Sequence, residues 1–288
     1  MEVSPALVAN VRQVWGREGD RWLAQLPTLI ADLRRRWGLS EPVPYSDLSY
    51  HYVARTTLEG KDVTLKIGCD LEGLRREARA LESLGGPIVS LIDSDLKLGA
   101  LLLEHAEPGS TLQSIWEPEE DHKITPILAG LMKDVRRTAP GTDFPTVGQW
   151  LQCILRFRPP FFKEAERLVE SVSFESAGRF LLHGDLHHGN VLKRGEHWAV
   201  IDPKGVVGPP AFEVYSLLLN PIIATADQLV HLLPDRLELL SNVLDLPVRE
   251  LAAWGFLGVE MSMAWDIEDG GEASEGSAQV AKSLMARL

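Results

Sequence analysis

The feature that most constrains this chain is a polar loop between short apolar runs at residues 180–202. It lies in Phe180-Leu-Leu-His-Gly-Asp-Leu-His-His-Gly-Asn190, which contains Asp185 and Asn190. A second apolar run, Trp198–Ile201, leads to Asp202. Phosphoryl transfer needs one carboxylate to orient and deprotonate an acceptor hydroxyl, and an amide and a carboxylate to hold Mg²⁺ against nucleotide phosphates. The pattern therefore indicates Asp185 as general base, with Asn190 and Asp202 as Mg²⁺ ligands.

Asp, Asn and Gly in such a loop can also be ordinary turn formers. Two residues from the first half of the chain favour the catalytic interpretation. Lys66 ends a predicted strand, and Glu77 lies on the helix predicted to follow. A kinase uses such a lysine to hold nucleotide phosphates and a helix glutamate to fix that lysine. Glu72 and Glu82 are on the same segment, so the identity of the glutamate stays open.

Periodicity predicts an α+β protein with its strands mainly in the first part. Residues 5–37 predict two helical pieces, with Pro27 in the first turn of the second. Residues 40–104 predict three strands, a helix and two strands, the last two being Ile88–Ile92 and Ala100–Glu104 around a turn at residues 93–95. Later residues are mainly helical apart from short strands within 180–203, with pieces at 122–138, 146–157, 161–171, 211–219, 223–232, 235–244 and 247–268.

This order indicates the bilobal plan of protein-kinase-like folds. We expect N-terminal helices at 1–39, a small β-rich lobe with one helix at 40–104, a hinge at 105–110 and a larger, mainly helical lobe with the catalytic loop at 111–288. A nucleotide would bind beneath the hinge.

The composition is that of an ordinary globular enzyme, with 45% hydrophobic and 24% charged residues. A formal charge of −12 argues against nucleic acid or an anionic membrane as partner and allows a cationic one. Cys69 and Cys153 do not make a disulfide framework, which indicates a reducing cytoplasm. We see no secretory signal and no apolar run approaching the ~20 residues of a spanning helix. We therefore expect a cytoplasmic protein, with monomer and dimer undistinguished.

The string from His183 to Asn190, followed by Ile201-Asp-Pro-Lys-Gly205, resembles the aminoglycoside phosphotransferase superfamily. Within it the chain is most similar to the streptomycin 6-kinase (aminoglycoside/hydroxyurea antibiotic resistance kinase) branch. The resemblance implies ATP and Mg²⁺ as cofactors, and adenine contacts from the backbone of Glu104 and Ala106. No activation segment of the protein-kinase type follows Asp202, which favours a small-molecule kinase.

The resemblance is incomplete at the phosphate loop. Between the first two strands the chain has no Gly-x-Gly-x-x-Gly but Tyr45-Ser-Asp-Leu-Ser-Tyr50. Serine hydroxyls and backbone N–H groups can still meet phosphate oxygens, and Ser49 is the candidate taken from this segment.

The acceptor candidates lie near the C-terminus. From Glu250 to Val280 there are seven acidic residues and no Lys or Arg. Within this stretch, Trp265-Asp-Ile-Glu-Asp-Gly270 is similar to a Trp-x-x-Glu-Asp-Gly element of streptomycin kinases. Carboxylates can replace the water around a polycationic sugar, and an aromatic side chain can cover a ring face. Trp265, Glu268 and Asp269 are therefore candidates, although a solvated acidic helix end is an equal alternative.

The loop histidines have less distinctive roles. His183 is expected to hydrogen-bond within the loop as a scaffold. His187 and His188 could face a substrate or serve the structure, and His187 is kept as an acceptor candidate.

Three other functions compete with this one. A metallohydrolase could use His183, Asp185, His187 and His188, but it would need further ligands and would leave Lys66 unused. A pseudokinase would lack Lys66, Asp185 or Asp202, and all three are present. A kinase for a neutral or monocationic metabolite is the serious rival. We predict a kinase that transfers the γ-phosphate of ATP to a hydroxyl of a streptomycin-like aminoglycoside, inactivating the antibiotic.

Overall fold

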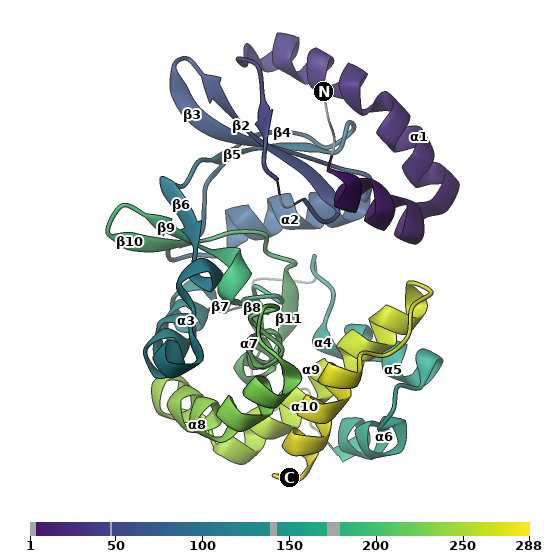
Figure 1. Cartoon of the computed structure of the whole chain (residues 1–288), viewed down its shortest axis with the longest axis vertical. Helices are drawn as coiled ribbons and strands as arrows, with labels where there is room; N and C mark the ends of the chain where they lie inside the picture. The colour runs from purple at the N-terminus through teal and green to yellow at the C-terminus, as the bar shows by residue number, and fades with distance from the viewer. Residues whose placement is uncertain (1–3, 47, 139–142, 172–178) are drawn as a thin grey trace. The chain divides into compact units, whose positions relative to one another are not determined.

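A five-stranded antiparallel sheet forms the centre of the first of two structural units, which takes in the chain up to Glu82 together with Val89–Ala106 (Figure 1). The computed structural model describes residues 4–46, 48–138, 143–171 and 179–288. The strand order is β1-β2-β3-β5-β4, and the strands are β1 (Val43–Pro44), β2 (His51–Leu58), β3 (Lys61–Gly68), β4 (Leu91–Asp95) and β5 (Ala100–Glu104). With helix α2 (Leu71–Ser83) between β3 and β4, the predicted order of three strands, a helix and two strands is confirmed.

Helix α1 (Pro5–Trp37) packs on one face of this sheet. Its buried residues, such as Leu26 and Leu33, share a core with alternate residues of the strands, such as Leu65 of β3. Side chains alternate between the two faces of a strand, so Lys66, next to Leu65, points to the other face, where it meets Glu77 of α2. The period of two along β3 therefore decides which helix Lys66 can reach.

The break in α1 is not where the sequence predicted it. The backbone leaves helical geometry at Gly16, with φ +50° and ψ −123°, whereas Pro27 lies inside the second piece. After this break Gly19 approaches Val11 so closely that a Cβ would lie 2.5 Å from the Val11 carbonyl oxygen. Two glycines thus permit a sharp bend that apolar periodicity alone does not reveal.

Strand β4 also differs from its predicted range. It runs Leu91–Asp95, so the polar residues assigned to a turn belong to the strand, and the turn follows at residues 96–99. The register shifts between Leu91 and Asp93, and β4 is an edge strand, where polar side chains are tolerated. Ile88 instead belongs to the second unit, where it forms an isolated parallel bridge with Val200.

The second unit, Ser83–Ile88 and Glu107–Leu288, contains two short antiparallel sheets. One has the order β10-β9-β6 and the other β11-β8-β7. The three strands predicted within 180–203 are confirmed as β8 (Phe180–Leu182), β9 (Val191–Arg194) and β10 (His197–Val200). The remaining strands are too short to give a periodic signal; they are β6 (Pro108–Thr111), β7 (Arg137–Thr138) and β11 (Val206–Gly208).

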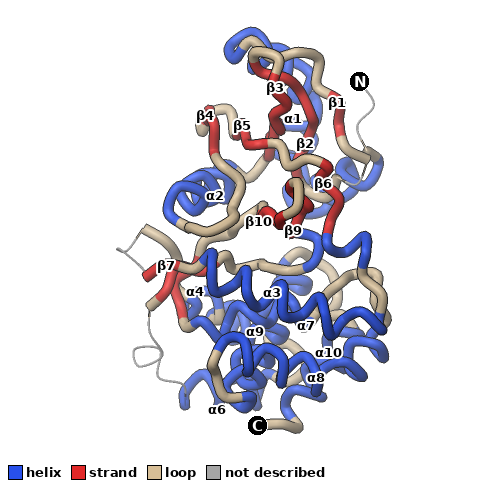
Figure 2. The backbone as a smooth tube through the Cα atoms, turned by 90° about the vertical axis from the view of Figure 1, so that its left-hand side faces the viewer, coloured by secondary structure: helices blue, strands red, loops and turns tan. Residues whose placement is uncertain are grey.

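Helices make up most of this second unit (Figure 2). The two pieces predicted at 223–232 and 235–244 are one helix, α8, which contains Pro234. A C-terminal helix, α10, was not predicted. The helices are α3 (Asp121–Val135), α4 (Val147–Trp150), α5 (Gln152–Phe157), α6 (Phe162–Ser171), α7 (Val214–Leu218), α8 (Ala226–Leu244), α9 (Val248–Glu268) and α10 (Glu275–Met285).

A buried ion pair joins α3 to α8. The Asp121 carboxylate accepts two hydrogen bonds from Arg236, at 2.9 and 2.6 Å, and further ones from Trp116 at 2.7 Å and Thr125 at 3.1 Å. Arg236 is 1% exposed and Asp121 2%. Burial alone would raise the pKa of Asp121, but the hydrogen bonds and charge of Arg236 outweigh burial and hold this pKa below its usual value.

Breaking this pair should destabilise the second unit strongly. We expect Arg236→Met to lower the free energy of unfolding by about 3–5 kcal/mol, because it leaves the Asp121 carboxylate buried without its partner. Urea unfolding measures the loss, and the double variant Asp121→Leu/Arg236→Met should recover much of it. Arg12→Met, in an exposed pair with Asp20, is the matched control and should change little. A small effect of Arg236→Met would contradict this account.

Candidate functional site

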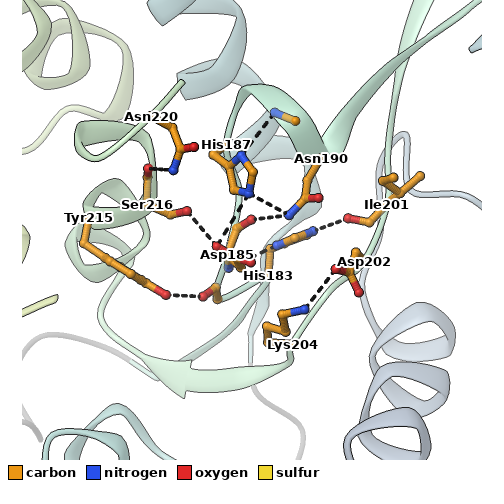
Figure 3. Close-up of polar contacts among 12 residues, drawn as sticks. His183, Asp185, His187, Asn190, Ile201, Asp202, Lys204, Tyr215, Ser216 and Asn220 are labelled. Carbon is orange, nitrogen blue, oxygen red and sulfur yellow. Dashed lines mark hydrogen bonds and ion pairs between the residues drawn. The ribbon is translucent and has the colours of Figure 1, made fainter. Parts of the chain in front are cut away.

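The loop of residues 183–190, which the sequence predicts to be catalytic and which is called the catalytic loop below, is fixed at its start by a buried histidine (Figure 3). His183 Nε2 donates to the carbonyl oxygen of Ile201 at 2.8 Å, and His183 Nδ1 accepts from the N–H of Asp185 at 3.2 Å. Burial lowers the pKa of His183 to about 4, so the ring is neutral and carries its proton on Nε2. The scaffold role expected of His183 is confirmed.

A short segment around the start of α7 contacts the loop through three polar side chains. Glu213 accepts a hydrogen bond from the N–H of Gly184 at 2.8 Å, and the Tyr215 hydroxyl donates to the Gly184 carbonyl oxygen at 2.8 Å. The Ser216 hydroxyl donates to Asp185 Oδ1 at 2.7 Å. Burial raises the pKa of Glu213 to about 7, against the opposing effect of backbone N–H donors from the loop. The segment around the start of α7 thus holds both the backbone of Gly184 and the carboxylate of Asp185.

At the end of the loop, Asn190 is oriented by its amide nitrogen. This nitrogen donates to the backbone carbonyl oxygen of Asp185 at 2.8 Å and lies 3.2 Å from His187 Nε2. The amide oxygen of Asn190 is the atom left for a cation. His187 Nδ1 accepts the N–H of Gly189 at 3.1 Å, so this histidine shapes the loop whatever else it contacts.

Asp202 lies in a turn that is tied to the same loop. Its φ is +60°, and its Oδ2 accepts a 2.9 Å hydrogen bond from the ammonium group of Lys204. The N–H groups of Lys204 and Gly205 both donate to the carbonyl oxygen of His183, at 2.8 and 3.0 Å. Pro203, whose ring fixes φ, lies between the tethered residues and Asp202. The turn that carries Asp202 is therefore held to the loop that carries Asp185.

The donor types suit Mg²⁺ rather than a tightly caged metal. Among the described residues, no group of three or more His, Cys, Asp or Glu side chains could hold a metal ion. Mg²⁺ is commonly bound through one or two protein oxygens, with phosphates and waters completing the octahedron. One amide oxygen of Asn190 and the carboxylate of Asp202 fit that requirement.

In the first unit, Lys66 and Glu77 form a buried ion pair. The ammonium nitrogen lies 2.8 and 2.6 Å from the two carboxylate oxygens, and each residue is 5% exposed. Glu72, one of the alternatives for this position, lies on the surface of α2 and faces Arg75 and Arg79. The geometry therefore selects Glu77 as the partner of Lys66.

The remaining nucleotide candidates lie in the same unit. Ser49 is exposed in the connection between β1 and β2, and its carbonyl oxygen accepts a hydrogen bond from Asn10 at 3.1 Å. Glu104 ends β5, with its N–H bonded to the Ser90 carbonyl oxygen at 2.9 Å and its carboxylate to the Ser90 N–H at 3.0 Å. Ala106 is buried and is the last residue of the unit.

An aromatic contact connects the acceptor candidates to the catalytic loop. The ring of Trp265, near the end of α9, packs edge-to-face on Trp150, with centroids 5.4 Å apart. Trp150 lies so close to Gly184 that a Cβ there would be 3.0 Å from its ring. The side chain of Trp150 therefore lies between Trp265, near the end of α9, and Gly184, the residue before Asp185.

The acidic stretch of residues 250–280 is not one continuous surface. Glu260 is fully buried, where its Oε2 accepts the N–H of Phe161 at 3.1 Å and burial raises its pKa to about 7. Glu268 and Asp269 are exposed, and Glu268 faces Arg156 at 3.5 Å. Partial burial raises the pKa of Asp269. The acidic face available to a ligand is therefore smaller than the sequence suggested, and one arginine lies beside it.

Sequence reasoning missed Glu213, Ser216 and Trp150. Glu213 and Ser216 interrupt the apolar helical segment predicted at 211–219, three positions apart and so on one face. A polar pair on the buried face of a short helix was a signal that it contacts other polar groups. Trp150 carried no signal of this kind, because a tryptophan on a predicted helix is commonly a core residue.

Residues 36–270 match the family of aminoglycoside/hydroxyurea antibiotic resistance kinases. The chain belongs to this family. It is therefore an ATP-dependent phosphotransferase with an alcohol group as acceptor, and the metallohydrolase and pseudokinase alternatives are wrong.

Relatives with a stated activity match over nearly the whole chain. Streptomycin 6-kinase from Streptomyces glaucescens is 28% identical, with 96% of this chain and 95% of that protein covered. Hydroxyurea phosphotransferase from Kitasatospora aureofaciens is also 28% identical, with 100% of this chain and 87% of that protein covered.

The fold is also found in solved structures. A thermostable mutant of aminoglycoside phosphotransferase APH(4)-Ia, in ternary complex with ADP and hygromycin B, is 16% identical; 90% of this chain and 98% of that chain are covered, and the TM-score is 0.62. At 16% identity, this similarity shows the fold and nothing about the substrate. The α+β, protein-kinase-like fold predicted from the sequence is confirmed.

Proposed function

We propose that this kinase transfers the γ-phosphate of ATP to a hydroxyl of a cationic, streptomycin-like aminoglycoside and so inactivates the antibiotic. The observation that carries the proposal is the contact chain from Gly184 through Trp150 to Trp265, because it links the loop of the general base to carboxylates suited to a cation. Streptomycin 6-kinase among the relatives supports the same acceptor.

Asp185 is proposed as the general base. As the acceptor oxygen bonds to the γ-phosphorus, its proton moves to the Asp185 carboxylate, and the bond from the γ-phosphorus to the β–γ bridging oxygen breaks to release ADP. The carboxylic acid then returns the proton to water. The N–H of Gly184 donates to Glu213, and the side-chain amide of Asn190 donates to the backbone carbonyl oxygen of Asp185; these bonds hold the backbone around this base.

The remaining nucleotide candidates, together with Asn190 and Asp202, are proposed to bind the nucleotide. Asn190 and Asp202 would hold Mg²⁺, which supplies charge neutralisation for the phosphates. Lys66, fixed by Glu77, would contact phosphate oxygens. The Ser49 loop is proposed as a further phosphate contact, and the backbone at Glu104 and Ala106 as the adenine contact.

We place the reaction in the cytoplasm. ATP is supplied there, and the two described cysteines, Cys69 and Cys153, are buried free thiols that a reducing compartment preserves.

A different acceptor remains a specific second candidate. The hydroxyurea phosphotransferase relative covers the whole chain at the same identity as the streptomycin 6-kinase, and Arg156 beside Glu268 would repel a cation. A small neutral hydroxyl compound, or a metabolite alcohol, would use the same base and nucleotide groups.

An acceptor screen decides between these functions. Purified enzyme with Mg-ATP is incubated with streptomycin, other aminoglycosides, hydroxyurea and simple alcohols such as choline, and ADP release and product mass are measured. We expect the highest kcat/KM for streptomycin or a related aminoglycoside. Turnover confined to hydroxyurea or a simple alcohol would replace the proposal with the second candidate.

The carboxylates at the end of α9 give a sharper test. We expect Glu268→Gln/Asp269→Asn to raise the acceptor KM by roughly tenfold or more, because charge-assisted hydrogen bonds are lost, and to leave the KM for ATP unchanged. Higher salt should weaken acceptor binding in the wild type, since the attraction is partly screened. Steady-state kinetics at two ionic strengths measures both effects.

Two further variants control for charge. Glu272→Gln/Glu275→Gln makes the same change in net charge nearby and should leave the acceptor KM unaltered. Arg156→Gln should lower it, because a competing cation beside Glu268 is removed. A wild-type acceptor KM in the Glu268/Asp269 variant would mean that these carboxylates are only a solvated helix end.

A further inference from the structure

The Asp185 side chain has one close partner in the part of the chain that the structure describes. Ser216 Oγ lies 2.7 Å from Asp185 Oδ1 and acts as donor (Figure 3). His187 Nε2 is 3.9 Å from the same oxygen, which is too long for a hydrogen bond. Asn190 bonds to the backbone oxygen of Asp185 and not to its carboxylate. The orientation of the carboxylate about its side-chain torsions therefore depends on Ser216.

Ser216 itself is held in place. It is 2% exposed and lies on α7, and Asn220 Nδ2 donates to its backbone carbonyl oxygen at 2.8 Å. Arg236 Nη1 donates to the carbonyl oxygens of Leu217 and Asn220, at 3.0 and 2.8 Å. Carbonyl groups of the last helical turn lack a donor one turn further along the helix, so these side chains supply donors there, beside the backbone N–H of Asn220 that also donates to Leu217 at 3.1 Å, and fix the end of α7. The Asp121–Arg236 ion pair thus anchors the element that carries Ser216.

We propose that Ser216 is a positioning residue for the general base. Its hydroxyl donates a hydrogen bond to Oδ1 of Asp185 and so fixes the orientation of the carboxylate. In this orientation Oδ2 faces the acceptor and is the atom that takes the proton. The inference rests on the proposed role of Asp185 as base. It adds Ser216 to the residues that serve the reaction, and it says which of the two carboxylate oxygens of Asp185 takes the proton. The chemistry of phosphoryl transfer alone specifies neither.

Two substitutions at position 216 test the inference. Ser216→Ala removes the hydroxyl with little change in volume and should lower kcat by about 10- to 100-fold, the range expected for one lost hydrogen bond to a charged group. The KM values for ATP and acceptor should stay within about twofold, since neither ligand contacts Ser216 in this scheme. Ser216→Thr, which keeps a hydroxyl, should restore most of the loss.

The matched control is Ser241→Ala, which also removes a serine hydroxyl donor in the same unit; Ser241 donates to the backbone carbonyl oxygen of Leu246 at 2.6 Å, away from Asp185. It should change stability by an amount similar to Ser216→Ala and leave kcat unaltered. The melting temperature of each variant is measured beside its kinetics, so that lost activity is not mistaken for lost folding.

The outcomes separate this inference from the proposed function. Wild-type kcat in a folded Ser216→Ala variant, together with an inactive Asp185→Asn variant, would overturn the role of Ser216 and leave Asp185 as base. An active Asp185→Asn variant would overturn the proposed role of Asp185 as base and, with it, this inference, while the acceptor screen tests the proposed acceptor separately. A fall in kcat for Ser216→Ala that Ser216→Thr does not restore would show that packing, and not the hydroxyl, is what matters.

Discussion

Replacing Asp185 by asparagine is expected to lower kcat by about two to four orders of magnitude, the range that a general base contributes. Asparagine has nearly the same shape, its amide oxygen can still accept the Ser216 hydroxyl, and the backbone bond from Asn190 is untouched. The loss should therefore be confined to proton transfer. Steady-state and single-turnover kinetics measure it, and calorimetry should show ATP affinity close to that of the wild type.

The control for this variant is Asp235→Asn, at an exposed position on α8. It makes the same chemical change in the same unit and should leave kcat unaltered. Asp185 would not be the base if its asparagine variant kept even a tenth of wild-type turnover in folded protein.

Replacing Asp202 by alanine is expected to abolish the metal dependence of ATP binding. The variant removes a carboxylate proposed to bind Mg²⁺ and leaves the ammonium group of Lys204 beside the site without its 2.9 Å partner. Because Mg²⁺ uses few protein ligands, loss of one carboxylate should reduce its affinity severely. Calorimetric titration of ATP with Mg²⁺ and with EDTA should give two different affinities for the wild type and a single weak one for Asp202→Ala.

Lys204→Met separates the two effects of that substitution. It removes the ammonium group but keeps the Asp202 carboxylate, so metal-dependent ATP binding should persist. If Asp202→Ala still bound ATP more tightly with Mg²⁺ than with EDTA, as the wild type is expected to, the assignment of Asp202 as a metal ligand would fail.

The catalytic loop was predictable because its signal is local. Short apolar runs around Asp185, Asn190 and Asp202 predicted the strands, and the structure has β8, β9 and β10 there. Lys66 and Glu77 were predictable for a related reason, since a strand residue and a residue in the second turn of the next helix can meet when that helix covers the face to which the strand residue points. The structure shows this contact as the ion pair between Lys66 and Glu77.

Contacts that depend on tertiary arrangement could not be predicted in the same way. Ser216 follows Asp185 by 31 positions, and nothing in the spacing says that the two side chains meet. The acidic stretch was misleading for the converse reason, because charge in the sequence does not reveal that Glu260 is buried. The bend at Gly16 and the polar edge strand β4 likewise depend on packing against neighbouring elements.

The two hydrogen bonds that the carbonyl oxygen of His183 accepts from Lys204 and Gly205 have a thermodynamic consequence for this enzyme. Two N–H groups from the Asp202 turn donate to this oxygen, so the chain itself, before any ligand arrives, holds that turn against the loop that carries Asp185. The entropy of ordering these groups is then lost during folding and not during each catalytic cycle. We expect ligand binding to show little conformational ordering here, which leaves the interaction energy of the acceptor available for its own orientation.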